Sequence, residues 1–129
     1  HVNGSLTVIW RDWDKIIDDI PKMIYITTVK PGEIKGPHLH FKRNSYFTCI
    51  RGKVVFIAKD KSGNYIEIES SEESPVLVQI PHGYPSAHIN VVREESTVLT
   101  ITDLAWKPDD NEMTNISFDD YDWNKWIKN

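Results

Sequence analysis

The sequence predicts an all-β domain built as a sandwich or barrel. Runs rich in β-branched and aromatic residues recur about every ten residues, and turn motifs such as KPGE, IRGK and KSGN separate them. Helical periodicity is confined to two segments near the ends of the chain. Because 129 residues correspond to about one domain, we expect a single domain over residues 1–129.

Eight runs have the composition of β-strands. In chain order they are LTVIW (6–10), MIYITTV (23–29), YFTCI (46–50), KVVFIAKD (53–60), NYIEIE (64–69), PVLVQI (75–80), HINVV (88–92) and TVLTIT (97–102). A further strand is expected through KGPHLHFKRN (35–44).

Two segments are expected to form short helices instead. In RDWDKIIDDI (11–20), Trp13, Ile16, Ile17 and Ile20 fall on one helical stripe. In FDDYDWNKWIKN (118–129), acidic residues come early and lysines late, which suits the helix dipole. We expect the aromatic residues of the second segment to pack on the barrel.

Composition excludes several classes of protein. The net charge of −4 argues against a nucleic-acid partner, and the single cysteine, Cys49, rules out an internal disulfide framework. The longest apolar runs are far too short to cross a bilayer, and the start of the sequence lacks the features of a signal peptide. We therefore expect a soluble, cytoplasmic domain with no membrane partner.

The stretch KGPHLHFKRN carries the strongest functional signal. Side chains alternate along a strand, so His38, His40 and Lys42 are predicted to share one face, and Arg43 to lie on the other. Two histidines and a lysine are unusual for a packed core. The pattern favours a functional pocket over a basic strand that faces water.

The spacing around these histidines resembles the cupin superfamily. Gly32, His38, His40 and Gly52 follow the first cupin motif, and PHGYPSAHIN (81–90) follows the second. The resemblance implies a double-stranded β-helix, that is, a jelly-roll barrel. It also implies a homodimer, since the family usually forms dimers and such barrels leave strand edges that a partner can cover.

The resemblance bears on metal binding as well. A metal-binding cupin places a glutamate at about Asn44 or Ser45 and a third histidine at Ser86, and serine is a poor ligand for first-row metals. We therefore expect no metal and no other cofactor. A metal-dependent enzyme that uses His38, His40 and His88 stays open as an alternative.

A closer resemblance is to the nucleotide-sugar cupins, which include dTDP-4-dehydrorhamnose 3,5-epimerase and the sugar 3,4-ketoisomerases. Gly36, His38 and His40 match the GxHxH pattern of the ketoisomerases, whereas TDLAWKPDDNE (102–112) is nearer the epimerase version. The resemblance implies a metal-independent isomerase or epimerase of a nucleotide-linked 4-keto-6-deoxy sugar. A non-catalytic cupin that binds a sugar nucleotide is the second alternative.

Both reactions remove a proton α to a ketone, which suits a neutral histidine. We predict that His38 is the base, that His40 positions substrate or returns the proton, and that Tyr25 is a candidate acid. Lys42 is a candidate cation for the enolate, and Asp103 is a candidate partner for a pocket histidine. The predicted substrate-binding residues are Lys35, Lys42, Arg43, Ser45, Phe47, Ser86, His88 and Trp106. The epimerases carry a lysine at the position of Ser45 and a tyrosine acid at that of Trp106. KPDDNE (107–112) is expected to be a solvated loop.

Overall fold

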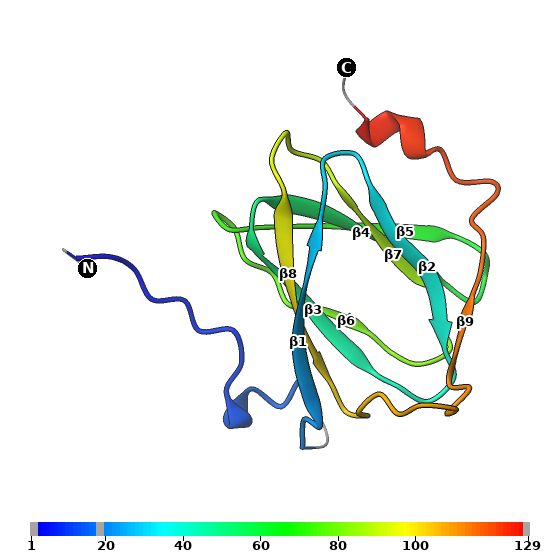
Figure 1. Ribbon diagram of the computed structural model, residues 1–129, viewed down its shortest axis with the longest axis horizontal. Helices are drawn as coiled ribbons and strands as arrows, with labels where there is room; N and C mark the ends of the chain where they lie inside the picture. Colours follow the sequence, from blue (N-terminus) through cyan, green and yellow to red (C-terminus); the bar gives the residue numbers. More distant parts are fainter. Residues whose placement is uncertain (1–2, 18–19, 128–129) are drawn as a thin grey trace.

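The computed structural model describes residues 3–17 and 20–127 and confirms the all-β prediction. Nine strands form two antiparallel sheets that face each other (Figure 1). The strands are β1 (Met23–Val29), β2 (Ile34–His40), β3 (Ser45–Arg51), β4 (Lys53–Lys59), β5 (Tyr65–Ser71), β6 (Val78–Ile80), β7 (Ser86–Asn90), β8 (Ser96–Thr102) and β9 (Met113–Asn115). One sheet has the order β1-β8-β3-β6 and the other β5-β4-β7-β2-β9.

Apolar side chains that point inward from both sheets form the barrel core. Alternation along each strand buries them, as expected for a sheet with one covered face. Cys49 belongs to this core and is fully buried, as a core-filling residue would be. The buried members of the cluster are Val29, Cys49, Val54, Phe56, Val78, Ile80 and Val98.

The two predicted helices are wrong in the part of the chain that the structure describes. Each segment contributes only a short 3-10 turn, η1 (Asp12–Asp14) and η2 (Trp123–Trp126). Lys15 ends η1 in the left-handed conformation, so the predicted stripe breaks after one turn. Its Trp13 is 68 % exposed, while Ile17 packs on the outer face of the four-stranded sheet. Residues 18 and 19 of this segment lie outside the described residues.

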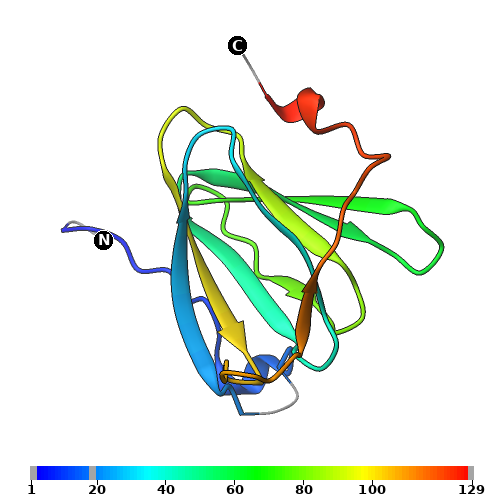
Figure 2. The same ribbon diagram turned by 45° about the vertical axis from the view of Figure 1, so that its right-hand side comes forward.

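The segment after β9 covers the outer face of the five-stranded sheet, and η2 lies above it (Figures 1 and 2). Phe118 is buried there, with Trp123 and Trp126 packed around it, as expected from their aromatic character. Tyr121 accepts a 2.6 Å hydrogen bond from Trp126 Nε1. Tertiary packing rather than helix formation therefore holds the C-terminal segment.

The predicted N-terminal strand LTVIW (6–10) does not form. The first described residues instead run away from the barrel (Figures 1 and 2), and Leu6 and Val8 are 74 % and 55 % exposed. Strand composition alone does not make a strand, because a strand needs a neighbour to accept its backbone hydrogen bonds.

The η1 and η2 turns, of three and four residues, are the helical elements of the described chain, and neither is long enough to span a membrane.

Candidate active site

A cavity of about 140 Å³ lies between the two sheets. The four-stranded sheet contributes side chains from β1, β3, β6 and β8, and the five-stranded sheet contributes them from β2, β4 and β7. Liquid water occupies roughly 30 Å³ per molecule, so the space is that of a few waters or one small ring. The lining residues are Tyr25, Thr27, Lys35, His38, His40, Ser45, Phe47, Phe56, Ile80, Ser86, Ala87, His88 and Thr100.

An irregularity in β2 decides which of its side chains reach this cavity. Lys35 pairs with His88 of β7, but His38 pairs with Ser86, so β2 has one extra residue at this point. Strict alternation would place Lys35 and His38 on opposite faces, and the extra residue returns both to the inner face. Gly36 sits at the irregularity with φ +91°, where a Cβ would meet the Ser86 carbonyl oxygen at 2.9 Å. A glycine is therefore required there.

Both predicted histidines line the cavity, and each is held through Nδ1. His38 Nδ1 lies 2.9 Å from Asn115 Oδ1, and His40 Nδ1 lies 2.8 Å from Glu112 Oε2. Because both partner atoms are acceptors, Nδ1 carries the proton in each ring. Each Nε2 therefore keeps its lone pair, and within residues 3–17 and 20–127 neither Nε2 has a hydrogen-bond partner.

Glu112 is the functional residue that the sequence interpretation missed. It lies in the segment that was expected to be a solvated loop, yet it is only 5 % exposed. Besides His40, its carboxylate accepts hydrogen bonds from the backbone N–H groups of Lys42 (3.1 Å) and Arg43 (2.8 Å). It therefore holds both the ring of His40 and the chain that follows β2. The glutamate that ends the epimerase-like segment 102–112 was the available signal.

Asn115 was also missed, because β9 is too short to have a strand pattern of its own. It lies directly opposite His38 in the β2–β9 ladder. The candidate carboxylate Asp103 has another role: it accepts hydrogen bonds from the backbone N–H and the side-chain amide of Asn44. The prediction that Asp103 orients a pocket histidine is therefore wrong.

Three of the predicted substrate-binding residues lie outside the cavity. Strand β2 ends at His40, so the alternation does not extend to Lys42, which is exposed. Arg43 is buried beside Glu112, and Trp106 is 67 % exposed on a loop. Arg43 and Trp106 line a separate neighbouring hollow. The structure brings the other candidates together, namely Tyr25, Lys35, His38, His40, Ser45, Phe47, Ser86 and His88.

The electrostatics of the His40–Glu112 pair favour a neutral base. Burial lowers the pKa of His40, and although Glu112 opposes this effect, the net pKa stays below its usual value. Burial acts to raise the pKa of Glu112, but the hydrogen bonds from His40, Arg43 and Lys42 outweigh it and lower the pKa. The resting pair is therefore an imidazole beside a carboxylate.

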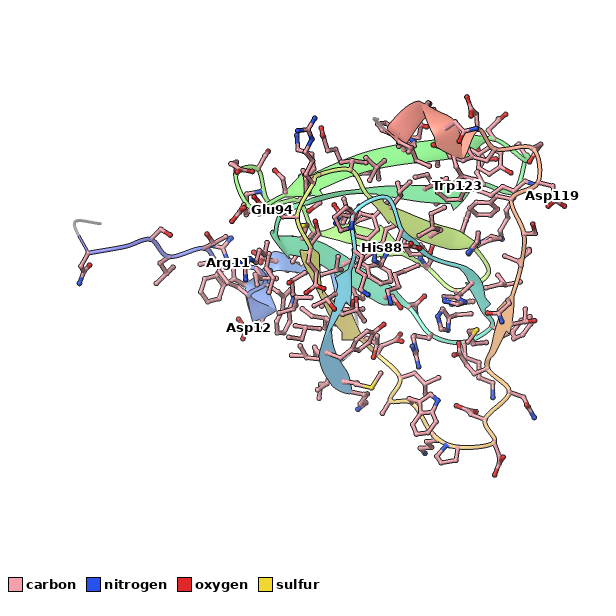
Figure 3. The ribbon with its side chains drawn as sticks, turned by 45° about the horizontal axis from the view of Figure 1, so that its top comes forward. Arg11, Asp12, His88, Glu94, Asp119 and Trp123 are labelled. Atoms are coloured by element: carbon pink, nitrogen blue, oxygen red, sulfur yellow. The ribbon has the colours of Figure 1, made fainter. Side chains whose placement is uncertain are left out.

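His88 lies deep between the sheets (Figure 3), 7 % exposed, with its ring 5.2 Å from that of Phe56. Its Nε2 is enclosed and has no hydrogen-bond partner among the described residues. Burial, with smaller contributions from Lys35 and His38, lowers the pKa of His88 to about 4. Among those same residues no three histidine, cysteine or acidic side chains converge to hold a metal ion, which argues against the site of His38, His40 and His88.

The buried His88 makes the fold sensitive to acid. The folded pKa of about 4 lies below the usual value of 6.5, so the unfolded chain binds more protons between these values. The free energy of unfolding should fall as the pH drops through this window, by roughly 3 kcal/mol from this residue. Urea unfolding measured from pH 7.5 to pH 4.5 tests this, and His88→Gln should flatten that part of the curve. An equally steep curve for His88→Gln would assign the acid sensitivity to other groups.

Comparisons with known proteins are consistent with this geometry. The family model described as "FdtA: WxcM-like, C-terminal" matches residues 1–122. The chain belongs to this family. No curated protein sequence matches it.

Solved structures share the fold of this FdtA/WxcM-like chain. The dTDP-6-deoxy-D-glucose-3,5-epimerase RmlC from Legionella pneumophila superposes with a TM-score of 0.78 at 15 % identity, over 92 % of this chain and 68 % of that one. The dTDP-4-dehydrorhamnose 3,5-epimerase from Sulfolobus tokodaii gives 0.70 at 21 % identity, over 81 % and 62 %. The capsular polysaccharide assembling protein CapF from Staphylococcus aureus gives 0.69 at 24 % identity, over 74 % of this chain and only 28 % of CapF. The predicted jelly-roll fold and the resemblance to nucleotide-sugar epimerases are confirmed.

Proposed function

We propose that the chain is an isomerase of a nucleotide-linked 4-keto-6-deoxy sugar and acts by removing the proton α to the ketone. One observation carries the proposal. Two histidines line one cavity between the sheets, each with Nδ1 held by an acceptor and Nε2 without a partner among the described residues. The named activity of the structural neighbours, 3,5-epimerisation of 4-keto sugar nucleotides, supports the same class of substrate.

We assign the base to His40, which revises the sequence-based choice of His38. When an imidazole takes up a proton it becomes a cation, and a carboxylate on Nδ1 stabilises that cation. His40 has Glu112 in this position, whereas His38 has the neutral amide of Asn115. His40 therefore gains more than His38 from accepting the proton at Nε2.

The remaining cavity residues fit the later steps. Loss of the α-proton creates an enolate, and Lys35 at the cavity wall is the cation that replaces the predicted Lys42. His38 and His40 project from one strand, whereas Tyr25 projects from the facing sheet. Return of the proton by a histidine to a neighbouring carbon gives a ketoisomerase, and return by Tyr25 from the other side gives an epimerase. The shared strand of the two histidines favours the first outcome.

Solvent exchange tests the proposed reaction directly. The protein is incubated in D₂O with dTDP-4-keto-6-deoxyglucose, and deuterium in the sugar is followed by NMR and mass spectrometry. We expect deuterium at a carbon next to the ketone, and the product NMR spectrum distinguishes a moved ketone from an inverted centre. Binding without exchange would favour the non-catalytic alternative.

We expect catalysis to be independent of metal ions. A serine occupies the position of the third cupin histidine, and the Nε2 of His88 is enclosed. Overnight dialysis against EDTA should leave both the exchange rate and the melting temperature unchanged. A loss that one divalent metal restores would instead support the metal-dependent alternative.

We propose that the protein works as a homodimer through the outer face of the four-stranded sheet. Ile24 and Ile26 of β1, an edge strand, point away from the cavity and are 62 % and 61 % exposed. Sedimentation should give twice the chain mass for the wild type and a monomer for the double variant Ile24→Asp/Ile26→Asp. The matched control Ile66→Asp, at an exposed isoleucine of the other sheet, should stay dimeric. A monomeric wild type would refute the proposal.

A further inference from the structure

The guanidinium of Arg43 is buried without a hydrogen-bond acceptor. Arg43 is 8 % exposed, and its side chain donates no hydrogen bond within the described part of the chain. The carboxylate oxygen Glu112 Oε2 lies 3.9 Å from its Nε, beyond hydrogen-bond length. An arginine has five N–H donors, and leaving them unpaired in a buried place is unfavourable. The arrangement calls for an acceptor from outside the chain.

Arg43 lines a hollow of about 320 Å³ on the far side of His40 from the cavity residues. The 106–113 segment forms the other wall, with Trp106 and Lys107 exposed. Outside the His40–Glu112 pair, the charged residues that line the hollow are Arg43 and Lys107 against Asp109 and Asp110, so these charges sum to zero. No net negative field therefore opposes an anion that pairs directly with the guanidinium.

We propose that this hollow is a phosphoryl-binding site in which Arg43 is the principal donor. The planar guanidinium fork matches the oxygens of a phosphoryl group, and charge-assisted hydrogen bonds of this kind are among the strongest in proteins. Lys107 supplies a second cation at the rim.

The source of the phosphoryl group rests on the proposed function. His40 lines both the hollow and the cavity. A sugar held at His40 can therefore place the diphosphate that it carries beside Arg43. Free phosphate is the other possible source, and the hollow requires only the phosphoryl chemistry that the two share.

The test compares the wild type with Arg43→Met, which keeps the side-chain length and removes the donors. Inorganic phosphate and dTDP are titrated separately in 0.15 M NaCl, which screens exposed charges, and amide NMR shifts and calorimetry are recorded. Both probes should shift the resonances of residues 106–113 in the wild type. Arg43→Met should weaken both affinities by roughly ten- to a hundredfold. The control Lys30→Met, which removes an exposed lysine between β1 and β2, should bind as the wild type does.

The outcomes separate this site from the proposed reaction. Equal binding of both probes by the wild type and Arg43→Met overturns the site and leaves the reaction untouched. Phosphate binding that is lost in Arg43→Met while no sugar nucleotide exchanges deuterium supports the site and removes the reaction. Tight binding of dTDP without binding of free phosphate assigns the site to the nucleotide substrate. Should Arg43→Met not fold, the wild-type shifts decide, and shifts confined to residues outside 106–113 overturn the proposal.

Discussion

Replacing His40 with asparagine should slow deuterium exchange into the 4-keto sugar nucleotide by roughly 10²–10⁴-fold. Asparagine keeps a polar side chain but has no lone pair that can take up the α-proton. The variant should still bind dTDP, because His40 acts on the sugar end of the substrate. Exchange is measured by NMR in D₂O at saturating substrate, so that a change in affinity does not enter the rate.

His38→Asn is the matched control, since it makes the same change two residues earlier on the same inner face of β2. We expect it to reduce exchange less than His40→Asn and to reduce product formation more, because His38 is assigned to later proton transfer. The opposite order, with full exchange in His40→Asn and none in His38→Asn, would return the base to His38. If neither substitution changes the rate, neither histidine is the base.

Glu112→Gln should reduce the exchange rate by a comparable factor, about 10²–10⁴-fold, although its side chain does not enter the cavity. The glutamine oxygen can still accept from the backbone N–H groups of Lys42 and Arg43, so its amide N–H₂ turns toward His40. His40 Nδ1 must then accept, which moves the ring proton to Nε2 and removes the lone pair that takes up the substrate proton. Circular dichroism and dTDP binding should stay close to those of the wild type.

Asp103→Asn is the control for this carboxylate, because Asp103 bonds Asn44 and not a histidine. It should leave the exchange rate within a few-fold of the wild type. Nitrogen-15 NMR of the imidazole rings gives a second measure, since the two tautomers of His40 have different shifts. Wild-type exchange in Glu112→Gln, with Nε2 of His40 protonated, would show that the tautomer does not control the reaction.

The sequence by itself determined the features that depend on local pattern. Seven of its predicted runs correspond to β1, β3, β4, β5, β6, β7 and β8, because alternating β-branched residues fit a half-buried sheet. The inner-face position of both His38 and His40 also followed from alternation alone. LTVIW (6–10) had the same composition, yet forms no strand, since composition does not supply a partner edge.

Tertiary structure decided the chemistry of the site. Glu112 and Asn115 lie 72 and 77 residues from the histidines that they hold, and only the pairing of β2 with β9 brings them close. The extra residue in β2 that places Lys35 beside His88 is likewise a matter of register with β7. Burial, which sets the pKa of His40 and His88, depends on what covers each ring. Local pattern determines which face a side chain takes, whereas its partners and its protonation depend on residues that are distant in the chain.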